Sequence, residues 1–448
     1  MKYSFSAYLP HYGVLTRLGA PIVAGQLGTI VLSFADTLMI GRHSTPELAA
    51  AAFVNNMFNL VIIFALGFSY AVTPTVGTLY GAGRKERVGE VVKNALACGT
   101  MLALLLMAGM AALWLNVERL GQPAELMPLI KPYFLVLLAS LPFVCWFNAF
   151  KQFADGITDT SLAMWVIIAG NVLNIFGNWT LIYGRFGLPE LGLLGAGVST
   201  LLSRVLMMAA MAAVFFLTKR YRPYAEGFRK GRVNRADFRR LNALGWPLAL
   251  QMGMETAAFS LSSVMVGWIG TTALAAHQVM LTICQLGFMV YYGIGAAAAV
   301  RVSLLVGQRD VRRAAACAYA AMHMVLLLAV AVCVPLFLVR HDIGLLFTSN
   351  AEVCGMVAVT MIPFMLYQAG DGMQIIFSNG LRGLSNVRPL VPVAFTSYFM
   401  VSLPLSYFFG IVEGMGLVGI WMAFPFGLTA SGVLYLLFFR RTVRRMSA

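Results

Sequence analysis

Residues 18–50 of the chain read LGAPIVAGQLGTIVLSFADTLMIGRHSTPELAA, and residues 244–276 read LGWPLALQMGMETAAFSLSSVMVGWIGTTALAA. The two stretches align without a gap at an offset of 226 residues. The matched positions are Leu18, Gly19, Pro21, Gly41, Thr45 and Leu48 to Ala50, with Leu244, Gly245, Pro247, Gly267, Thr271 and Leu274 to Ala276. Because glycines and prolines recur at the same spacing, chance similarity between apolar segments is a poor explanation. The chain is therefore predicted to contain an internal duplication.

The similarity continues beyond these stretches and divides the chain into halves. The same offset pairs Gly67 with Gly293 and Gly81 with Gly307. With small shifts, Pro142, Phe143, Phe153, Gly156, Gly192 and Gly195 match Pro363, Phe364, Phe377, Gly380, Gly416 and Gly419. The sequence predicts an N-lobe over residues 1–218, a basic cytoplasmic linker over residues 219–241 and a C-lobe over residues 242–448.

The composition places these lobes in a membrane. Of 448 residues, 60% are hydrophobic and 11% are charged, whereas soluble proteins carry about 25% charged residues. Runs long enough to cross a bilayer fall near residues 14–40, 48–80, 92–115, 128–150, 160–183, 190–218, 242–268, 273–305, 313–339, 353–379, 388–410 and 414–439. We expect an all-α polytopic membrane protein with twelve transmembrane helices in two pseudo-twofold-related lobes of six.

The distribution of Lys and Arg predicts the orientation of these helices. If the N-terminus is inside, the inner segments carry 26 of the 32 basic residues and the outer loops carry five. Because cytoplasmic loops are enriched in Lys and Arg, both termini are predicted to be cytoplasmic. The net charge of +15 is then mostly a consequence of topology, and no nucleic-acid partner is expected. The basic stretch is expected to rest against anionic membrane lipids.

Three acidic residues fall inside the predicted spans and require an explanation. They are Asp36, Glu255 and Asp371, whereas the other 14 of 17 acidic residues map to loops or span ends. A carboxylate at the centre of a membrane helix costs roughly 2.5 to 3.5 kcal/mol. Arg204 is the clearest basic residue within a span. The carboxylates are predicted to face a wet cavity and to bind cations, and the alternative is a buried polar network without a transport role.

Polar neighbours accompany Asp36. Asn174 and Asn178 are four residues apart, so both lie on one helix face, and Thr200 adds a hydroxyl. Hard oxygen ligands suit sodium, and the same carboxylates could take up protons instead if burial favours their neutral form. Hydrogen bonding between helices is the alternative role for the two asparagines and the threonine.

The acidic residues of the second half have neighbours of a different kind. Tyr367 precedes Asp371 by four residues, and Gln251 precedes Glu255 by four residues. A carboxylate next to an aromatic ring suits an organic cation, although packing is an alternative role for Tyr367. The prolines at 21 and 247 lie inside the first helix of each lobe, where each favours a bend. Bending at Pro21 and Pro247 is a candidate gating motion.

Other kinds of chemistry find little support. The six cysteines lie in or beside apolar runs and are interpreted as packing residues, and the five histidines are scattered. No Walker-type phosphate loop is present, so energy is expected to come from an ion gradient. We predict a transport protein and not an enzyme, without a cofactor other than Na⁺ and/or H⁺ as the coupling ion.

The residues resemble the multidrug and toxic compound extrusion (MATE) family, and within it the NorM-type branch. The resemblance covers nearly the whole chain and includes FADTLMIGR at residues 34–42, LAAHQ at residues 274–278 and SNGLRGLSN at residues 378–386. One departure is FADGITDTS at residues 153–161, which lacks the arginine that family members often have after the glycine.

The resemblance implies cation-coupled antiport, in which amphipathic and often cationic drugs or dyes leave the cell in exchange for Na⁺ or H⁺. Glu255 and Asp371 fall where the branch carries its C-lobe acidic pair. The family's N-lobe cation site is matched in this sequence by a second set of residues, which is Asp36, Asn174, Asn178 and Thr200. The ligand chemistry leads us to favour sodium over protons. We expect a monomer in the bacterial inner membrane that works by alternating access; the alternative is a flippase for lipid-linked oligosaccharides or lipids.

Overall fold

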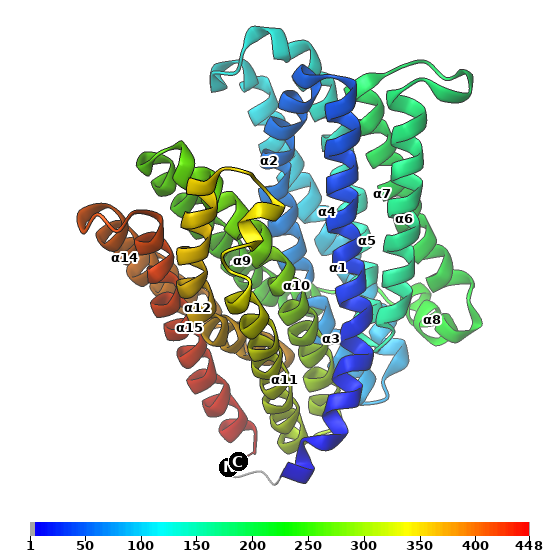
Figure 1. Ribbon diagram of the computed structural model, residues 1–448. Coiled ribbons are helices and arrows are strands. Elements are labelled where there is room, and N and C mark those ends of the chain that lie inside the picture. Colours follow the sequence, from blue (N-terminus) through cyan, green and yellow to red (C-terminus); the bar gives the residue numbers. More distant parts are fainter. Residues whose placement is uncertain (1–4, 448) are drawn as a thin grey trace. The chain divides into compact units, whose positions relative to one another are not determined.

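Every regular element is a helix in residues 5–447, which the computed structural model describes (Figure 1). The first half contains α1 (Leu9–His43), α2 (Thr45–Ser69), α3 (Val72–Gly81), α4 (Lys85–Leu115), α5 (Met127–Gly156), α6 (Thr160–Ile182), α7 (Gly192–Leu217) and α8 (Arg222–Lys230). The second half contains α9 (Arg235–Ile269), α10 (Thr271–Gly307), α11 (Val311–Leu338), α12 (Ala351–Gly383), α13 (Leu390–Ala394), α14 (Leu403–Tyr407) and α15 (Gly416–Ser447).

The helices confirm the expected membrane fold. Among the described residues, eleven helical segments are long and apolar enough to cross a membrane. The seventh expected span, residues 242–268, is the one outside this group; it lies in α9, which has 35 residues but lower hydropathy because it carries Gln251 and Glu255. The eleventh expected span is one continuous segment, Leu390–Val412. In it, α13 and α14 alternate with the π-helical stretches Phe395–Ser402 and Phe408–Val412.

The chain forms two compact units, and their limits cut through α1 and α9. The first unit is Ala24–Ala249, and the second unit consists of the residues up to Val23 and from Leu250 onward. The two division points are 226 residues apart, which equals the offset of the sequence repeat. Each division lies two residues after a proline, Pro21 in α1 and Pro247 in α9. The first part of α1 therefore belongs to the second unit, and the first part of α9 belongs to the first unit.

Repeated glycines allow these helix beginnings to pack closely. In the first unit, a Cβ atom on Gly67 would lie 2.9 Å from Ala249 Cα. In the second unit, a Cβ atom on Gly293 would lie 2.3 Å from Val23 Cγ2. Gly67 and Gly293 are counterparts in the repeat, and so are Val23 and Ala249. The duplicated glycines thus serve the same close contact between helices in both units.

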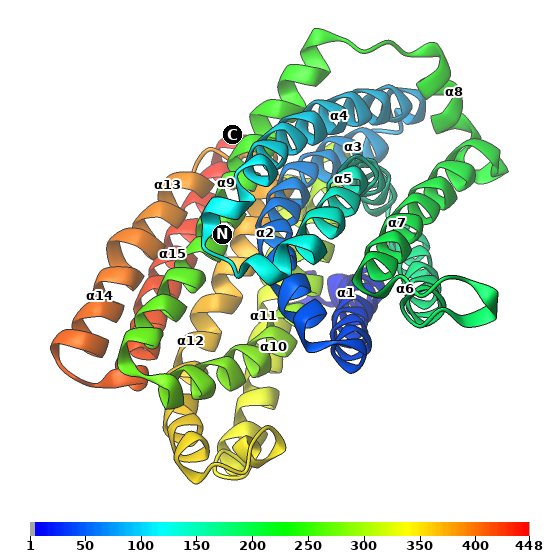
Figure 2. The same ribbon diagram turned by 90° about the horizontal axis from the view of Figure 1, so that it is seen from above.

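Each unit is organised around one central helix. In the first unit α5 contacts α2, α3, α4, α6 and α7. In the second unit α12 contacts α10, α11 and α15, and α12 and α15 lie side by side in both views (Figures 1 and 2). The core of the second unit includes fully buried Tyr367, Tyr398 and Trp421. In the second unit, the predicted residues Tyr367 and Asp371 therefore lie on the central helix itself, among well-packed neighbours.

The basic stretch between the halves is folded. Its helix α8 packs on α4, where a Cβ atom on Gly89 would lie 2.0 Å from the Tyr224 carbonyl oxygen. The Tyr221 hydroxyl donates to Asp159 Oδ2 at the start of α6. Burial and the neighbouring carboxylate raise the pKa of Tyr221, so this phenol remains a donor at neutral pH. Arg222, Arg229 and Lys230 remain exposed, and their contact with lipid stays a prediction.

Candidate cation and substrate sites

The three predicted membrane carboxylates fall in different units. Asp36 on α1 belongs to the first unit, whereas Glu255 on α9 and Asp371 on α12 belong to the second. Among the described residues, none of the three makes an ion pair within 4.0 Å. Their immediate neighbours differ, so each unit is described by itself.

The structure brings Asp36 together with all three residues predicted around it, Asn174, Asn178 and Thr200. Asn178 Nδ2 donates to Asp36 Oδ1 at 2.5 Å. In the amide orientation that satisfies both of its ends, Asn174 donates to Asp36 Oδ1 at 3.0 Å and accepts from the Thr200 hydroxyl at 3.3 Å. The two asparagines therefore hold the carboxylate from one face of α6, as their spacing predicts.

This group retains an unused oxygen. Asn174 is 1% exposed and Asn178 is fully buried. Asn178 Oδ1 is buried and accepts no hydrogen bond. A buried acceptor without a donor is unfavourable unless a cation or water contacts it. The oxygens of Asp36, Asn178 and Thr200 thus offer ligands for a small hard cation.

Arg204 supplies the nearest positive charge to this group. Its Nη1 donates to Ser140 Oγ at 2.6 Å, and its guanidinium attracts the Asp36 carboxylate. Tyr133 also interacts electrostatically with Asp36 and donates to Asn55 Oδ1 at 3.0 Å. Tyr133 and Ser140 could not be identified from spacing because they lie on α5, away from the carboxylate in sequence. Asp36 therefore has one basic residue in its surroundings, but among the described residues it has no ion-pair partner within 4.0 Å.

The two carboxylates of the second unit lie near each other, and no basic residue is found to attract either of them among the described residues. Asp371 is 7% exposed, and it interacts electrostatically with Glu255. Gln374 Nε2 lies 3.4 Å from Glu255 Oε2 and donates to it, whereas Gln374 Oε1 has no partner. Two acidic groups with one amide donor favour an additional cation, because burial makes uncompensated negative charge costly.

An aromatic cluster borders the acidic pair. Tyr367, 1% exposed, lies one turn before Asp371 on α12. Its ring stacks on Trp421 at a centroid distance of 6.2 Å and an interplanar angle of 24°. Its hydroxyl lies 2.7 Å from Cys284 Sγ. The ring electrons and the carboxylates together can stabilise an organic cation.

One further predicted residue, Gln251, and two residues that were not predicted lie near the Glu255–Asp371 pair. Gln251 is buried one turn before Glu255, and among the described residues no hydrogen bond links it to either carboxylate. Sequence reasoning missed Gln374, although its spacing of three residues from Asp371 places both on one face of α12. It also missed Tyr398, which interacts electrostatically with both carboxylates. No local spacing connects Tyr398 to them.

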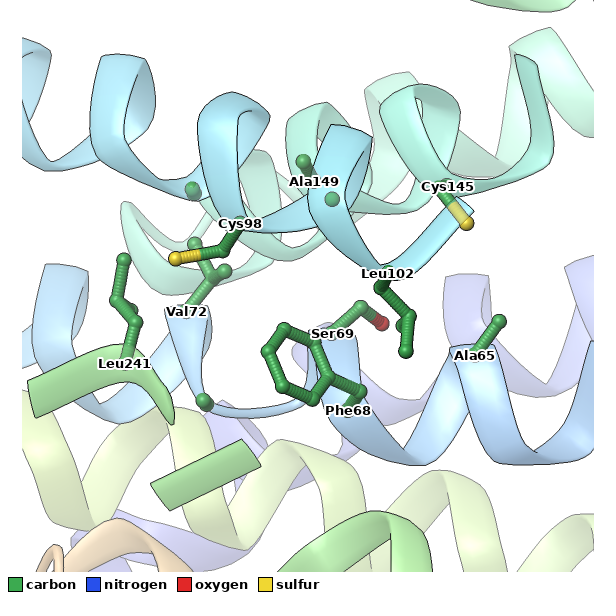
Figure 3. A pocket seen from close by; sticks show the side chains of 12 residues that line it. Ala65, Phe68, Ser69, Val72, Cys98, Leu102, Cys145, Ala149 and Leu241 are labelled. Carbon is green, nitrogen blue, oxygen red and sulfur yellow. The ribbon is translucent and has the colours of Figure 1, made fainter. Parts of the chain in front are cut away.

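A small cavity in the first unit is lined by none of the predicted site residues (Figure 3). Its volume is about 20 Å³, and its walls include Phe68, Val72, Cys98, Leu102 and Cys145. A volume of this size accommodates about one water molecule. The cavity is therefore too small for a drug-sized ligand.

Comparison with known proteins gives a family match in both halves. The MatE family model matches residues 21–180 and residues 247–408. The two matched segments begin at the paired prolines and are 226 residues apart, so the family comparison confirms the internal duplication.

Solved structures share the fold over the full chain at low sequence identity. A MATE structure in a bent conformation has a TM-score of 0.89 and 20% identity, with coverage of 100% of this chain and 99% of that chain. A multidrug resistance MATE transporter in an outward-facing conformation has a TM-score of 0.87 and 19% identity, with full coverage of both chains. A MOP superfamily transporter from Pyrococcus furiosus has a TM-score of 0.86, 19% identity and full coverage of both.

Proposed function

Because the chain belongs to the MATE family, whose members are transporters and not enzymes, we propose that it is a cation-coupled multidrug efflux antiporter. It exports amphipathic and often cationic drugs or dyes by alternating access, and inward movement of Na⁺ or H⁺ drives export. We assign it to the NorM-type branch on the sequence motifs given above.

The observation that carries this proposal is the acidic pair of the second unit. Glu255 and Asp371 interact with each other, and among the described residues neither has a salt-bridge partner within 4.0 Å. Tyr367 adds an aromatic ring one turn from Asp371. A lipophilic cation would supply the missing charge and would also contact the ring. The proposed substrate-binding residues are therefore Glu255, Asp371, Tyr367 and Gln251.

Competition between cations explains how exchange can occur. When a coupling ion occupies the carboxylates, the organic cation loses its electrostatic partner and is released. A ligand shifts a conformational equilibrium only by its difference in affinity for the two states. The inward-facing and outward-facing states must therefore bind the coupling ion with different affinities.

We assign the first unit a role in ion coupling. The proposed ligands there are Asp36, Asn174, Asn178 and Thr200, and the unpartnered Asn178 oxygen supports this assignment. Oxygen ligands favour Na⁺, and a buried carboxyl can alternatively carry a proton. Glu255 and Asp371 are proposed to form the second ion site, which competes with substrate.

Pro21 and Pro247 are the proposed gating positions. Both lie inside long continuous helices, close to the division between the two compact units. A proline removes one helical hydrogen bond and allows the axis to bend there. A related MATE structure has been described as bent, which supports bending as the motion that changes access to the sites.

A second candidate function is the flipping of lipid-linked oligosaccharides or lipids. The similar Pyrococcus furiosus transporter is described as having a binding pocket of reverse polarity that suggests a different function. A pyrophosphate-linked substrate would require basic residues at its site. The acidic pair with its aromatic neighbour favours an organic cation instead.

The proposed setting is the bacterial inner membrane, where the protein acts as a monomer among membrane lipids with both termini in the cytoplasm. The excess of basic residues in the predicted inner segments supports this orientation.

Ethidium efflux from proteoliposomes tests the proposal directly. Separate Na⁺ and H⁺ gradients would be imposed on vesicles that contain wild-type protein or the Asp371→Asn variant. We expect efflux in response to at least one gradient and a loss of efflux in the variant. A wild-type protein without gradient-dependent efflux, or a fully active Asp371→Asn variant, would contradict the proposed function.

A further inference from the structure

His277 is buried near the beginning of α10, and both of its ring nitrogens form hydrogen bonds. Its exposed fraction is 1%. Trp421 Nε1 lies 3.0 Å from His277 Nδ1, and Ser263 Oγ lies 2.8 Å from His277 Nε2. The side chain thereby joins α9, α10 and α15 within the second unit.

The partners determine the tautomer of this histidine. An indole nitrogen can only donate, so Nδ1 must accept from Trp421, and the proton of the neutral ring lies on Nε2. Nε2 then donates to the Ser263 hydroxyl, which itself donates to the Phe259 carbonyl oxygen at 3.0 Å. All donors in this series of hydrogen bonds, which runs from Trp421 to the Phe259 carbonyl, point in one direction. Each hydrogen bond therefore fixes the orientation of the next group.

One end of the chain of hydrogen bonds reaches the aromatic cluster beside Asp371. Trp421 is fully buried, and the indole N–H would lose its acceptor without His277. The same indole stacks on Tyr367 and packs edge-on against Phe424 at 5.4 Å. A rotation of the indole would therefore displace the Tyr367 ring.

The other end reaches the helix that carries Glu255. Phe259 and Ser263 follow Glu255 at intervals of four residues, so the three lie along one side of α9. The Phe259 ring also stacks on Phe424 at 5.0 Å with an interplanar angle of 29°. His277 thus holds the spacing between the helix of Glu255 and the aromatic cluster beside Asp371.

We propose that His277 is a positioning residue of the second-unit site, which acts through Trp421 to fix the Tyr367 ring beside Asp371 and thereby sets the affinity for organic cations. This inference rests on the proposed function. It assigns substrate affinity, and not ion coupling, to a residue that contacts neither carboxylate.

Two substitutions separate the two hydrogen bonds of the ring. In His277→Asn the amide oxygen can accept from Trp421, whereas in His277→Phe no acceptor remains. Ethidium binding to purified protein would be measured by fluorescence anisotropy, and Na⁺- and H⁺-driven ethidium release would be measured in proteoliposomes. Each variant would also be checked for monodispersity and thermal stability.

We expect His277→Phe to weaken ethidium binding about tenfold, the size of a lost cation–π contact. The ion concentration for half-maximal release should change less than about twofold, because the carboxylates remain. His277→Asn should bind ethidium within about twofold of wild type. Thr100→Val is the matched control because it removes the acceptor of another indole, Trp146 Nε1 at 2.9 Å, in the first unit. It should leave ethidium binding unchanged.

Trp421→Phe provides an independent variant, since it removes the donor and keeps an aromatic ring. It should weaken ethidium binding like His277→Phe, and the double variant should be no weaker than either single variant. If His277→Phe does not fold, loss of binding in Trp421→Phe with retention in His277→Asn supports the proposal, and equal affinity in these two variants overturns it.

Several outcomes would overturn the role of His277 alone. The first is wild-type ethidium affinity in a folded His277→Phe variant. The second is an equal loss of ethidium affinity, ion response and thermal stability in that variant, which would indicate a purely structural role. By contrast, absence of ethidium binding in the wild type, or unchanged binding in Asp371→Asn, would contradict the proposed function itself.

Discussion

The Asp36 site and the Glu255–Asp371 site belong to duplicated halves, yet their acidic residues do not correspond. The 226-residue offset pairs Asp36 with Ser262 and Glu255 with Thr29. The same offset pairs glycine with glycine and proline with proline at the close helix contacts. The duplication therefore preserved the packing of the scaffold, whereas the polar chemistry of the two sites diverged.

The surroundings of the carboxylates differ accordingly. Asp36 accepts a hydrogen bond from Asn178, and one basic residue, Arg204, lies near enough to attract it. Glu255 and Asp371 add two acidic groups beside an aromatic ring and have one amide donor between them. From this difference we infer that the first site suits a small coupling ion and the second suits an organic cation.

The largest expected effect is at Asp371. Asp371→Asn removes the buried charge next to Tyr367 and should reduce ethidium export by on the order of 100-fold, since truncation of one partner of a buried charge pair costs about 3 kcal/mol. Resistance of cells to ethidium would be measured at matched expression. Glu413→Gln, an exposed acidic position, is the control. Unchanged resistance in Asp371→Asn would remove the distinction between the two sites.

Glu255→Gln should have the next largest effect. The glutamine keeps an oxygen that can accept from Gln374, but the charge is lost. We expect ion-driven ethidium release to fall roughly tenfold or more, because the amide lacks the negative charge that attracts either cation. Release from preloaded vesicles after an ion jump would measure this. Full ion-driven release would show that Asp371 alone suffices for coupling.

Asp36→Ser tests the division of labour, because serine is the residue at the corresponding position of the second half. We expect ion-driven export to fall about tenfold while equilibrium ethidium binding stays within about twofold of wild type. The loss of the carboxylate also leaves Arg204 without its countercharge, so thermal stability should fall. A parallel loss of ethidium binding would mean that both sites bind substrate.

The smallest expected effect is at Thr200. Thr200→Val removes one neutral ligand and should raise the ion concentration for half-maximal export about twofold. Thr180→Val is a matched control, because its hydroxyl donates within α6 to the Gly177 carbonyl oxygen. A larger effect at Thr180 would assign the change to helix packing instead of ion binding.

The sequence allowed the fold to be predicted because membrane helices, repeated glycines and paired prolines leave local signals. It also allowed the Asp36 group to be predicted, since Asn174 and Asn178 share a helix face. Gln374 could have been found by its spacing from Asp371. Tyr398 and Trp421 could not, because their proximity to the acidic pair depends on how different helices pack.

The exchange of helix beginnings between the compact units affects the biosynthesis of the protein. The first unit extends to Ala249, so it lacks its final helical segment until the ribosome has passed the middle of the chain. The second unit includes residues up to Val23, which are synthesised long before partners in the same unit such as Gly293. Synthesis of the first half alone therefore completes neither unit, and an N-terminal fragment that ends before α9 would lack part of its own unit.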